Sequence, residues 1–184
     1  MAENETYTVN QSKISIIQGD ITQQTTDAIV NAANSSLMGG GGVDGAIHRA
    51  GGPAILEECI EIVNKQGRLP AGQAVITTAG NMPSKHVIHT VGPIWRGGSQ
   101  REPDLLASAY RESLKIAAAN NLASVSFPSI STGAYGYPLD KAAPIALKEA
   151  ASFLQQPSSI KEVVFVLFDA RTYEAYTTTL GKIK

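Results

Sequence analysis

Two glycine-rich segments of this sequence have the composition of loops that bind a ligand through the backbone. One covers residues 39–45 and the other lies around Gly133 and Gly136, and each falls between an expected strand and an expected helix. In open α/β sheets, ligands bind at such turns outside the strand ends. No Lys or Arg occurs over residues 34–48 or 128–140, so backbone N–H groups and helix dipoles would have to hold an anion. Two such loops predict a diphosphate ligand that is bound rather than transferred.

The first segment also matches the dinucleotide-binding pattern G-x-G-x-x-G over residues 40–45. The match is weak, because residues 34–38 separate it from the strand and the next strand ends in Thr-Thr-Ala-Gly, without an acid for a ribose hydroxyl. The sequence contains no G-x-x-x-x-G-K-[ST] and no G-x-S-x-G. These absences exclude a P-loop phosphotransferase and argue against an α/β-hydrolase. The interpretation of this segment as a flexible loop without a ligand is less favoured, because four consecutive glycines lose backbone entropy on folding and bury nothing.

Asn34 and Asp44 are the candidate catalytic side chains. Asp44 could be only the N-cap of the helix that follows it. Within the glycine loop, and with Asn34 three residues past a strand, it could also orient or deprotonate a water beside a bound ligand. His48 lies four residues after Asp44 on the same helical face, and we expect it to support Asp44 rather than to touch substrate.

Asp20, Cys59 and two histidines are the other residues whose types could do chemistry. Asp20 could cap a turn or accept a hydrogen bond from the exocyclic amine of a base, and the sequence leaves both readings open. Cys59 shares helical spacing with apolar residues, which favours a core position over a nucleophile. His86 and His89 face opposite sides of one expected strand and have no Cys or carboxylate at ligand spacing. We therefore expect no metal site.

The elements that must position these residues alternate between β and α periodicity, which is typical of an α/β sandwich with a largely buried sheet. We expect strands at residues 13–18, 28–31, 73–78, 86–91, 124–128 and 162–168, with an edge strand at 6–10. We expect helices at residues 43–50, 53–66, 103–120, 140–155 and 170–182. The stretch from Gly92 to Glu102 is expected to be a surface loop without chemistry of its own.

The composition fits one ordinary globular domain. The chain has 184 residues, a net charge of −1 and no long block of like charge, so a general nucleic-acid or membrane-surface binder is not expected. Its single cysteine excludes an internal disulfide and suits a reducing compartment. The N-terminus lacks the basic start and apolar run of a signal peptide. We expect a cytoplasmic protein without a membrane span.

Five ordered sequence blocks resemble a macro domain. They are Gly19-Asp20-Ile21-Thr22, the stretch from Asp27 to Asn34, Gly39 to His48, His89-Thr90-Val91-Gly92-Pro93, and Phe127 to Pro138. The form Gly-Gly-Gly-Val-Asp-Gly-Ala-Ile-His resembles the MacroD-type hydrolase class. The resemblance covers nearly the whole chain and implies a single macro domain over residues 1–184. It also implies a three-layer α/β/α sandwich around a mixed sheet of about six or seven strands, with ADP-ribose as the ligand.

The resemblance also implies a role for individual residues. Asp20 would hold the adenine amine, Ile21 would lie beside the base and Phe168 would pack on its face. The diphosphate and distal ribose would be enclosed by two sets of residues, namely Gly41, Gly42 and Val43 on one side and Ser131, Thr132, Gly133, Ala134 and Tyr135 on the other. Asn34 and Asp44 match the pair at the distal ribose. A larger aliphatic residue often stands where this chain has Ala134, which bears only on how tightly that loop closes.

The activity implied is removal of mono-ADP-ribose from acidic residues of proteins, together with deacetylation of O-acetyl-ADP-ribose. ADP-ribosylated proteins and O-acetyl-ADP-ribose would be the partners, and no cofactor is expected. A zinc-containing subclass of macro domains does not fit, because its Cys and His ligands are missing. We expect a monomer. The alternative is a module that binds ADP-ribose without turning it over, and the presence of both Asn34 and Asp44 favours the enzyme.

Overall fold

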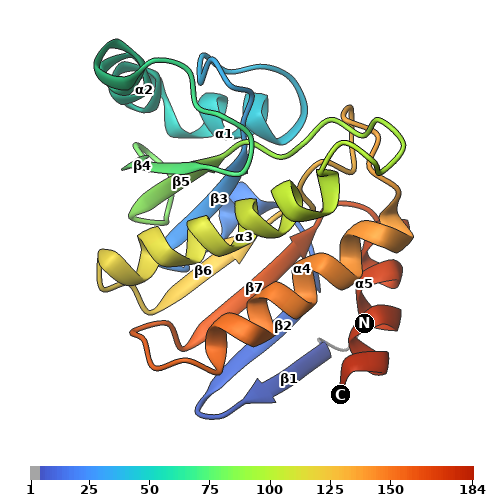
Figure 1. The fold of residues 1–184 in the computed structure, drawn as a ribbon. Coiled ribbons are helices and arrows are strands. Elements are labelled where there is room, and N and C mark those ends of the chain that lie inside the picture. Colours follow the sequence, from blue (N-terminus) through green and yellow to red (C-terminus); the bar gives the residue numbers. More distant parts are fainter. Residues whose placement is uncertain (1–4) are drawn as a thin grey trace.

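The computed structural model describes residues 5–184 and places a seven-stranded mixed sheet between two layers of helices (Figure 1). The strands are β1 (Glu5–Val9), β2 (Ser12–Gln18), β3 (Ala28–Ala32), β4 (Ala74–Thr78), β5 (His86–Thr90), β6 (Ser124–Phe127) and β7 (Glu162–Leu167). The helices are α1 (Gly42–Gly51), α2 (Pro53–Gln66), α3 (Glu102–Ala119), α4 (Leu139–Leu154) and α5 (Ala170–Ile183), with a 3₁₀ turn, η1, at Ile21–Gln23.

The sheet has the strand order β1-β2-β7-β6-β3-β5-β4. Its inner strands β2, β7, β6, β3 and β5 run parallel, whereas β1 and β4 are antiparallel edge strands. Because the inner strands are parallel, their carboxyl ends meet at one edge of the sheet. The loops that follow these strands therefore lie side by side at that edge, which is where an open α/β sheet binds ligands.

Each face of the sheet has its own apolar core. Strand β7 illustrates the alternation, because Val163 and Phe165 pack with helices α3, α4 and α5, whereas Val164 and Val166 pack with α1 and α2. Inner strands that are covered on both faces read as nearly continuous apolar runs. The three-layer α/β/α sandwich with a mixed sheet is thus confirmed.

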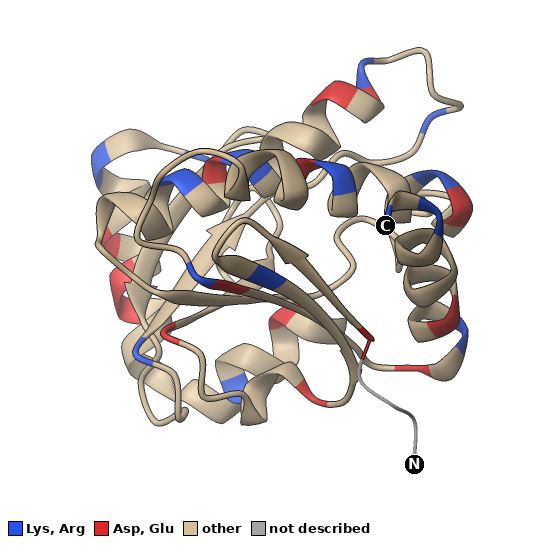
Figure 2. Ribbon diagram, turned by 90° about the horizontal axis from the view of Figure 1, so that it is seen from below, with Lys and Arg blue, Asp and Glu red and all other residues tan. Residues whose placement is uncertain are grey.

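Element boundaries differ from the sequence-based expectation by at most one residue at each end, and the earlier start of α1 affects the site. Helix α1 begins at Gly42 rather than Val43, and α3 begins at Glu102, which was expected to end a loop. Strand β7 ends at Leu167, so Phe168 lies beyond it. Acidic and basic residues are scattered over the ribbon, and neither sign of charge gathers in one region of this view (Figure 2). In the part of the chain that the structure describes, no helix is both long and apolar enough to cross a membrane.

Candidate functional site

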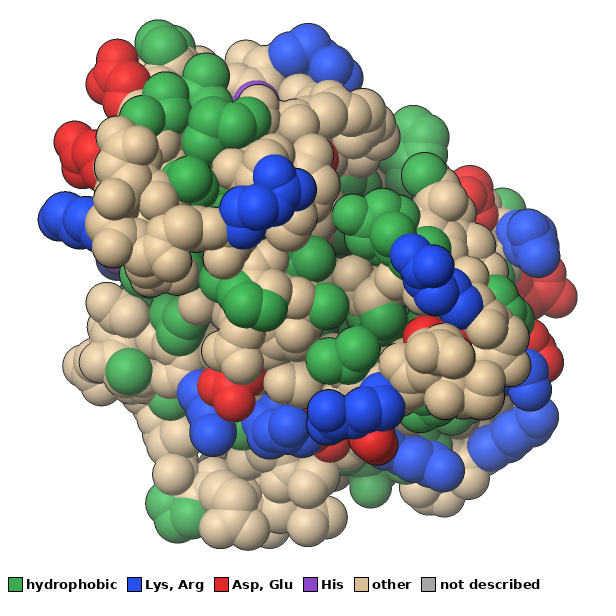
Figure 3. All heavy atoms as spheres, turned by 45° about the horizontal axis from the view of Figure 1, so that its top comes forward, with side chains coloured by type: hydrophobic (Ala, Val, Ile, Leu, Met, Phe, Trp, Pro, Cys, Tyr) green, Lys and Arg blue, Asp and Glu red, His purple; other side chains and the backbone are tan. Residues whose placement is uncertain are grey.

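The predicted site residues lie at the carboxyl edge of four neighbouring strands, β2, β7, β6 and β3. Three spacings of about 4.8 Å between these strands give a span of roughly 14 Å. Figure 3 brings this edge of the molecule toward the viewer, and its hollowed middle is hydrophobic or uncharged, with most charged side chains around it. An extended ligand could therefore lie across the strand ends on a surface that is largely uncharged.

The two glycine-rich loops meet in one cavity of about 340 Å³. Most residues that the resemblance assigns to the diphosphate and distal ribose line it, namely Asn34, Gly41, Gly42, Val43, Asp44, Ser131, Gly133, Ala134 and Tyr135. Its floor is completed by residues at the ends of β3 and β6, including Ala32 and Ser129. Segments about ninety residues apart in the sequence thus enclose one space.

The first loop needs glycine for its backbone path. Gly39 has φ +90° and Gly42 has φ +58°, in the left-handed region that side-chain-bearing residues rarely adopt. A methyl group on Gly41 or Gly42 would meet no protein atom within 4 Å. The loop therefore leaves its backbone open toward the cavity at the N-terminus of helix α1, where the helix dipole favours an anion.

The second loop carries two features that point to a ligand. Ser131 has φ +67° although it is not glycine, and its buried Oγ has no hydrogen-bond partner within residues 5–184. The N–H groups of Gly136 and Tyr137 donate to carbonyls of the loop itself. By contrast, the N–H groups of residues 132–135 donate to no acceptor in the described chain. A strained residue, an unpaired hydroxyl and free N–H groups on one loop are typical of a ligand clamp.

Asn34 and Asp44 approach each other on either side of Gly40. A methyl on Gly40 would lie 3.3 Å from Asp44 Oδ2 and 3.5 Å from Asn34 Nδ2. The Asn34 amide donates to the carbonyl of Gly39 (3.0 Å) and its Oδ1 accepts from Ser36 Oγ (2.7 Å). These bonds fix the start of the glycine loop.

The interpretation of Asp44 as a helix N-cap is wrong. The N-cap of α1 is Gly41 and no side chain caps this helix, because the helix begins two residues before Asp44. The Asp44 side chain is nearly buried instead, and its Oδ1 accepts from Asn31 Nδ2 at 2.8 Å. His48 Nε2 lies 3.4 Å from the same oxygen but makes no hydrogen bond within the described residues, so the expected support of Asp44 by His48 stays a prediction.

The three residues expected to hold the base lie outside the 340 Å³ cavity, at the ends of the adjacent strands β2 and β7. The N–H of Gly19 donates to the carbonyl of Leu167 at 2.9 Å, so the chain leaves both strands at the same place. Asp20 caps η1, since its Oδ1 accepts from the N–H (2.9 Å) and the hydroxyl (2.7 Å) of Thr22. Ile21 is buried, whereas the Phe168 ring is 82% exposed. An exposed aromatic ring at a strand end is suited to stacking on a base.

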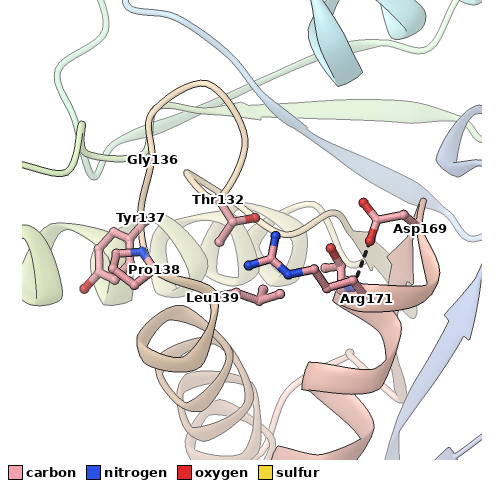
Figure 4. A pocket seen from close by; sticks show the side chains of 8 residues that line it. Thr132, Gly136, Tyr137, Pro138, Leu139, Asp169 and Arg171 are labelled. Carbon is pink, nitrogen blue, oxygen red and sulfur yellow. Dashed lines mark hydrogen bonds between the residues drawn. The ribbon is translucent and has the colours of Figure 1, made fainter.

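Thr132 differs from its neighbours in the second loop. Its hydroxyl donates to Ser129 Oγ at 2.8 Å, and its side chain lines a second cavity of about 270 Å³ between this loop and the start of α5 (Figure 4). Arg171 points toward Thr132 in this cavity, while Asp169 caps α5 by accepting from the N–H of Thr172 at 2.8 Å. Thr132 therefore lines this second cavity and not the main one, and its role in binding a ligand stays a prediction.

Two buried groups behind the site, Cys59 and His89, are uncharged at neutral pH. Burial, with the nearby charges of Asp44 and Glu58, raises the pKa of the Cys59 thiol to about 11, and Cys59 lies on the buried face of α2 in the core, as expected. Burial, followed by the effect of His48, lowers the pKa of His89 to about 3. Within the described residues, no group of three or more His, Cys, Asp or Glu side chains could hold a metal ion.

Glu102 and Trp95 support the site and were missed in the stretch expected to be a plain loop. The Glu102 side chain is buried and its Oε2 accepts from the N–H groups of Arg96 (2.9 Å) and Gly98 (2.8 Å). The loop held in this way carries Trp95, whose backbone N–H donates to the backbone carbonyl of Tyr135 at 2.9 Å. Glu102 thus stabilises, through one loop, the backbone of another loop that lines the cavity.

Comparison with known proteins gives one consistent family. The family model "Macro domain" matches residues 30–146. A macro domain-containing protein of Caldanaerobacter subterraneus is 62% identical over 91% of this chain and 95% of its own length. An O-acetyl-ADP-ribose deacetylase of Escherichia coli is 53% identical over 93% of this chain and 98% of its own length.

Solved structures agree with this result. A variant of the Oceanobacillus iheyensis macrodomain, solved with ADPR, is 45% identical over 98% of both chains, with a TM-score of 0.94. The Trypanosoma brucei macrodomain in complex with ADP-ribose is 40% identical over 91% of this chain and 69% of its own, with a TM-score of 0.83. With a family model that covers more than half of its length and relatives above 50% identity, the chain belongs to the macro domain family.

Proposed function

We propose that this protein hydrolyses esters of ADP-ribose. Its substrates would be O-acetyl-ADP-ribose and proteins that carry mono-ADP-ribose on Asp or Glu. The observation that carries the proposal is the cavity in which two loops without Lys or Arg meet the Asp44 carboxylate and the Asn34 amide. The relatives named as O-acetyl-ADP-ribose deacetylases and the solved complexes with ADP-ribose support the same ligand.

The arrangement of the site supports one orientation of the ligand. The exposed Phe168 ring and Asp20 would take the adenine at the ends of β2 and β7. The free N–H groups of residues 132–135 and the N-terminus of α1 would hold the diphosphate. The distal ribose would then reach Asn34 and Asp44, which lie at the end of β3.

The chemistry follows from the groups at that end. Water adds to the ester carbonyl, the bond to the ribose oxygen breaks, and the products are ADP-ribose and a free carboxylic acid. Asp44 Oδ2 would take the proton of the attacking water and return it to the leaving ribose oxygen, while the Asn34 amide would orient the ribose. A serine linkage offers no carbonyl to water and its serine would leave as a strongly basic alkoxide. We therefore expect serine-linked ADP-ribose to stay intact.

A turnover assay with matched variants tests this function. The protein is incubated with O-acetyl-ADP-ribose and, separately, with an ADP-ribosyltransferase automodified on Glu, and released ADP-ribose is measured. Asp44→Ala and Asn34→Ala should slow single-turnover hydrolysis by about 10² or more while ADP-ribose affinity is largely kept. Asp140→Ala is the control, because it also removes an acid from the first turn of a helix, outside the cavity.

The same assay separates the enzyme from a module that only binds ADP-ribose. Tight binding of ADP-ribose without release from either substrate would favour the binding module. An unchanged rate in Asp44→Ala, with an active wild-type protein, would remove Asp44 from the reaction. Measuring the melting temperature of the same samples excludes loss of folded protein as the cause of a slower rate.

A further inference from the structure

A line of polar side chains is buried directly behind Asp44, and the proposed reaction does not use it. Asn31 on β3 and His89 on β5 are both fully buried, and they are register partners in adjacent parallel strands. Thr77 on β4 is also buried and continues the line. Burying a polar side chain within an apolar strand costs free energy unless the side chain is hydrogen-bonded. Each of these three side chains therefore needs a hydrogen-bond partner.

The hydrogen bonds along this line have only one consistent direction. Asn31 Nδ2 lies 2.8 Å from Asp44 Oδ1 and 3.1 Å from His89 Nδ1. An ionised carboxylate only accepts hydrogen bonds, so the amide nitrogen of Asn31 must face it, and its second hydrogen is directed to His89. His89 Nδ1 is then an acceptor, which places the ring proton on Nε2.

The far end of the line fixes that proton. His89 Nε2 lies 2.9 Å from Thr77 Oγ1, and the Thr77 hydroxyl in turn donates to the carbonyl of Thr78 at 2.9 Å. The hydroxyl proton is committed to that carbonyl, so Thr77 Oγ1 accepts from His89 Nε2. The titratable groups around the ring are His48, with a centroid 6.3 Å away, Cys59, whose Sγ is 3.9 Å from Nε2, and Asp44 beyond Asn31. The low pKa of His89, about 3 because of burial and His48, keeps the ring neutral.

These bonds give the two carboxylate oxygens of Asp44 different surroundings. Oδ1 is held by Asn31 and approached by His48, whereas Oδ2 lies beside Gly40 and the amide of Asn34, at the cavity. Asn31 Oδ1 has no partner within residues 5–184. An apolar residue would fill this strand position without an unpaired oxygen, so the amide N–H groups are the reason for having Asn here.

We propose that His89 is a positioning residue of the hydrolase, which acts through Asn31 to hold the Asp44 carboxylate with Oδ2 toward the substrate. This inference rests on the proposed function. His89 is fully buried and does not line the 340 Å³ cavity. Its loss should therefore affect the rate through the orientation of Asp44 and leave the binding of ADP-ribose nearly unchanged.

Two substitutions of His89 separate positioning from simple core packing. In His89→Asn, the amide oxygen can replace Nδ1 as the acceptor for Asn31. In His89→Gln, the longer side chain reaches toward Thr77 and places no acceptor at the Nδ1 position. Misplacement of a catalytic group by about 1 Å costs roughly 10²-fold in rate. We therefore expect His89→Gln to lower kcat by about 10- to 100-fold and His89→Asn to retain a rate within about threefold of wild type.

The measurements are the melting temperature, ADP-ribose affinity and single-turnover hydrolysis of O-acetyl-ADP-ribose, on each variant alone and combined with Asp44→Ala. His89→Gln should have no further effect on the rate once Asp44 is Ala, because the two residues act as a unit. Equal rates for wild type and His89→Gln would overturn the positioning role, as would an equal loss of rate in both backgrounds. An inactive wild-type protein would instead overturn the proposed function.

A measurement on the unaltered protein keeps the inference falsifiable if the variants do not fold. The ¹H–¹⁵N spectrum of the side-chain imidazoles should show His89 as the neutral Nε2–H tautomer at pH 7. Ligand-free and ADP-ribose-bound samples should show the same tautomer. A proton on Nδ1, or a charged ring at pH 7, would contradict the direction of the hydrogen bonds and overturn the proposal.

Discussion

Asp20 uses its two carboxylate oxygens differently, and replacement by Asn tests its expected role in binding the base. Both hydrogen bonds that Asp20 accepts, from the N–H and the hydroxyl of Thr22, end on Oδ1. Asn keeps that oxygen, so the cap of η1, worth about 1 kcal/mol, should persist. The other oxygen becomes an N–H donor, which cannot accept a hydrogen bond from the amine of adenine.

The size of the effect follows from the exposure of Asp20. Hydrogen bonds to charged groups contribute about 1.5–3 kcal/mol. Because the Asp20 side chain is solvent-exposed, we expect the lower end, about 1.5 kcal/mol, which is roughly a tenfold rise in the Kd of ADP-ribose. Asp20→Ala should weaken binding by a similar factor and should also lose the cap, which lowers the melting temperature.

Calorimetric titration with ADP-ribose and with its inosine counterpart measures this role. Hypoxanthine carries a carbonyl where adenine carries the amine, so Asp20→Asn should reduce or reverse the preference of the wild-type protein for adenine. Asp104→Asn controls for the loss of one negative charge, because Asp104 lies in the first turn of α3 and away from the cavity. If Asp20→Asn bound ADP-ribose as tightly as wild type, Asp20 would be a cap and nothing more.

Four further predictions concern groups around the site. Burial alone would raise the pKa of Glu102, but the N–H groups that it accepts from lower it below 4.5. Its stabilisation is therefore present above pH 4.5 and lost as the pH falls further. The melting temperature of Glu102→Gln should lie below that of wild type at pH 7, with a gap that narrows in acid, and a constant gap would contradict this. Because neither glycine-rich loop carries Lys or Arg, the affinity for ADP-ribose should depend only mildly on salt. Arg171→Ala should change neither that affinity nor its salt dependence in titrations at low and high salt, whereas a smaller salt slope would place Arg171 on the phosphates. The Cys59 thiol, with a pKa of about 11, should react with a disulfide reagent only as the protein unfolds, and fast labelling of native protein would refute its burial. Gly41→Ala should weaken ADP-ribose binding without loss of stability, because a methyl there meets no protein atom and Gly41 lines the main cavity. Gly67→Ala is the control, because Gly67 has φ +84° and lies outside the main cavity. It should lower the melting temperature and leave ADP-ribose binding intact.

The positions of the two glycine-rich loops could be predicted from the sequence because their signal is local. Glycine density, the absence of Lys and Arg, and the apolar runs on either side are all visible within about twenty residues. The start of helix α1 was placed one residue too late, at Val43, because Gly42 is a poor helix former by propensity. The N-cap interpretation of Asp44 failed because α1 begins at Gly42, with Gly41 as its N-cap, and already includes Asp44.

The groups that support the site could not be predicted, because their partners are distant or carry no side-chain signal. Asn31 and His89 are each visible as a polar residue in an apolar strand, but only the β3–β5 register brings them together. Glu102 accepts from backbone N–H groups of the preceding loop, and a backbone donor has no residue type to recognise. Strand order is non-local in the same sense, since β3 lies between β5 and β6 rather than beside β2.

A site built mainly from backbone donors is consistent with turnover of the proposed substrates. The product ADP-ribose keeps the same diphosphate as the substrate, so every contact to that diphosphate also retains the product. Uniform binding of this kind lowers KM without raising kcat. In the proposed function, loops without Lys or Arg would hold the phosphates by N–H groups and the dipole of α1, and they would avoid ion pairs that slow release. The charged group nearest the reaction is then Asp44, whose Oδ1 is held from behind by Asn31. If both proposals hold, the loops would determine the affinity for ADP-ribose, and the buried side chains behind Asp44 would affect the rate of hydrolysis.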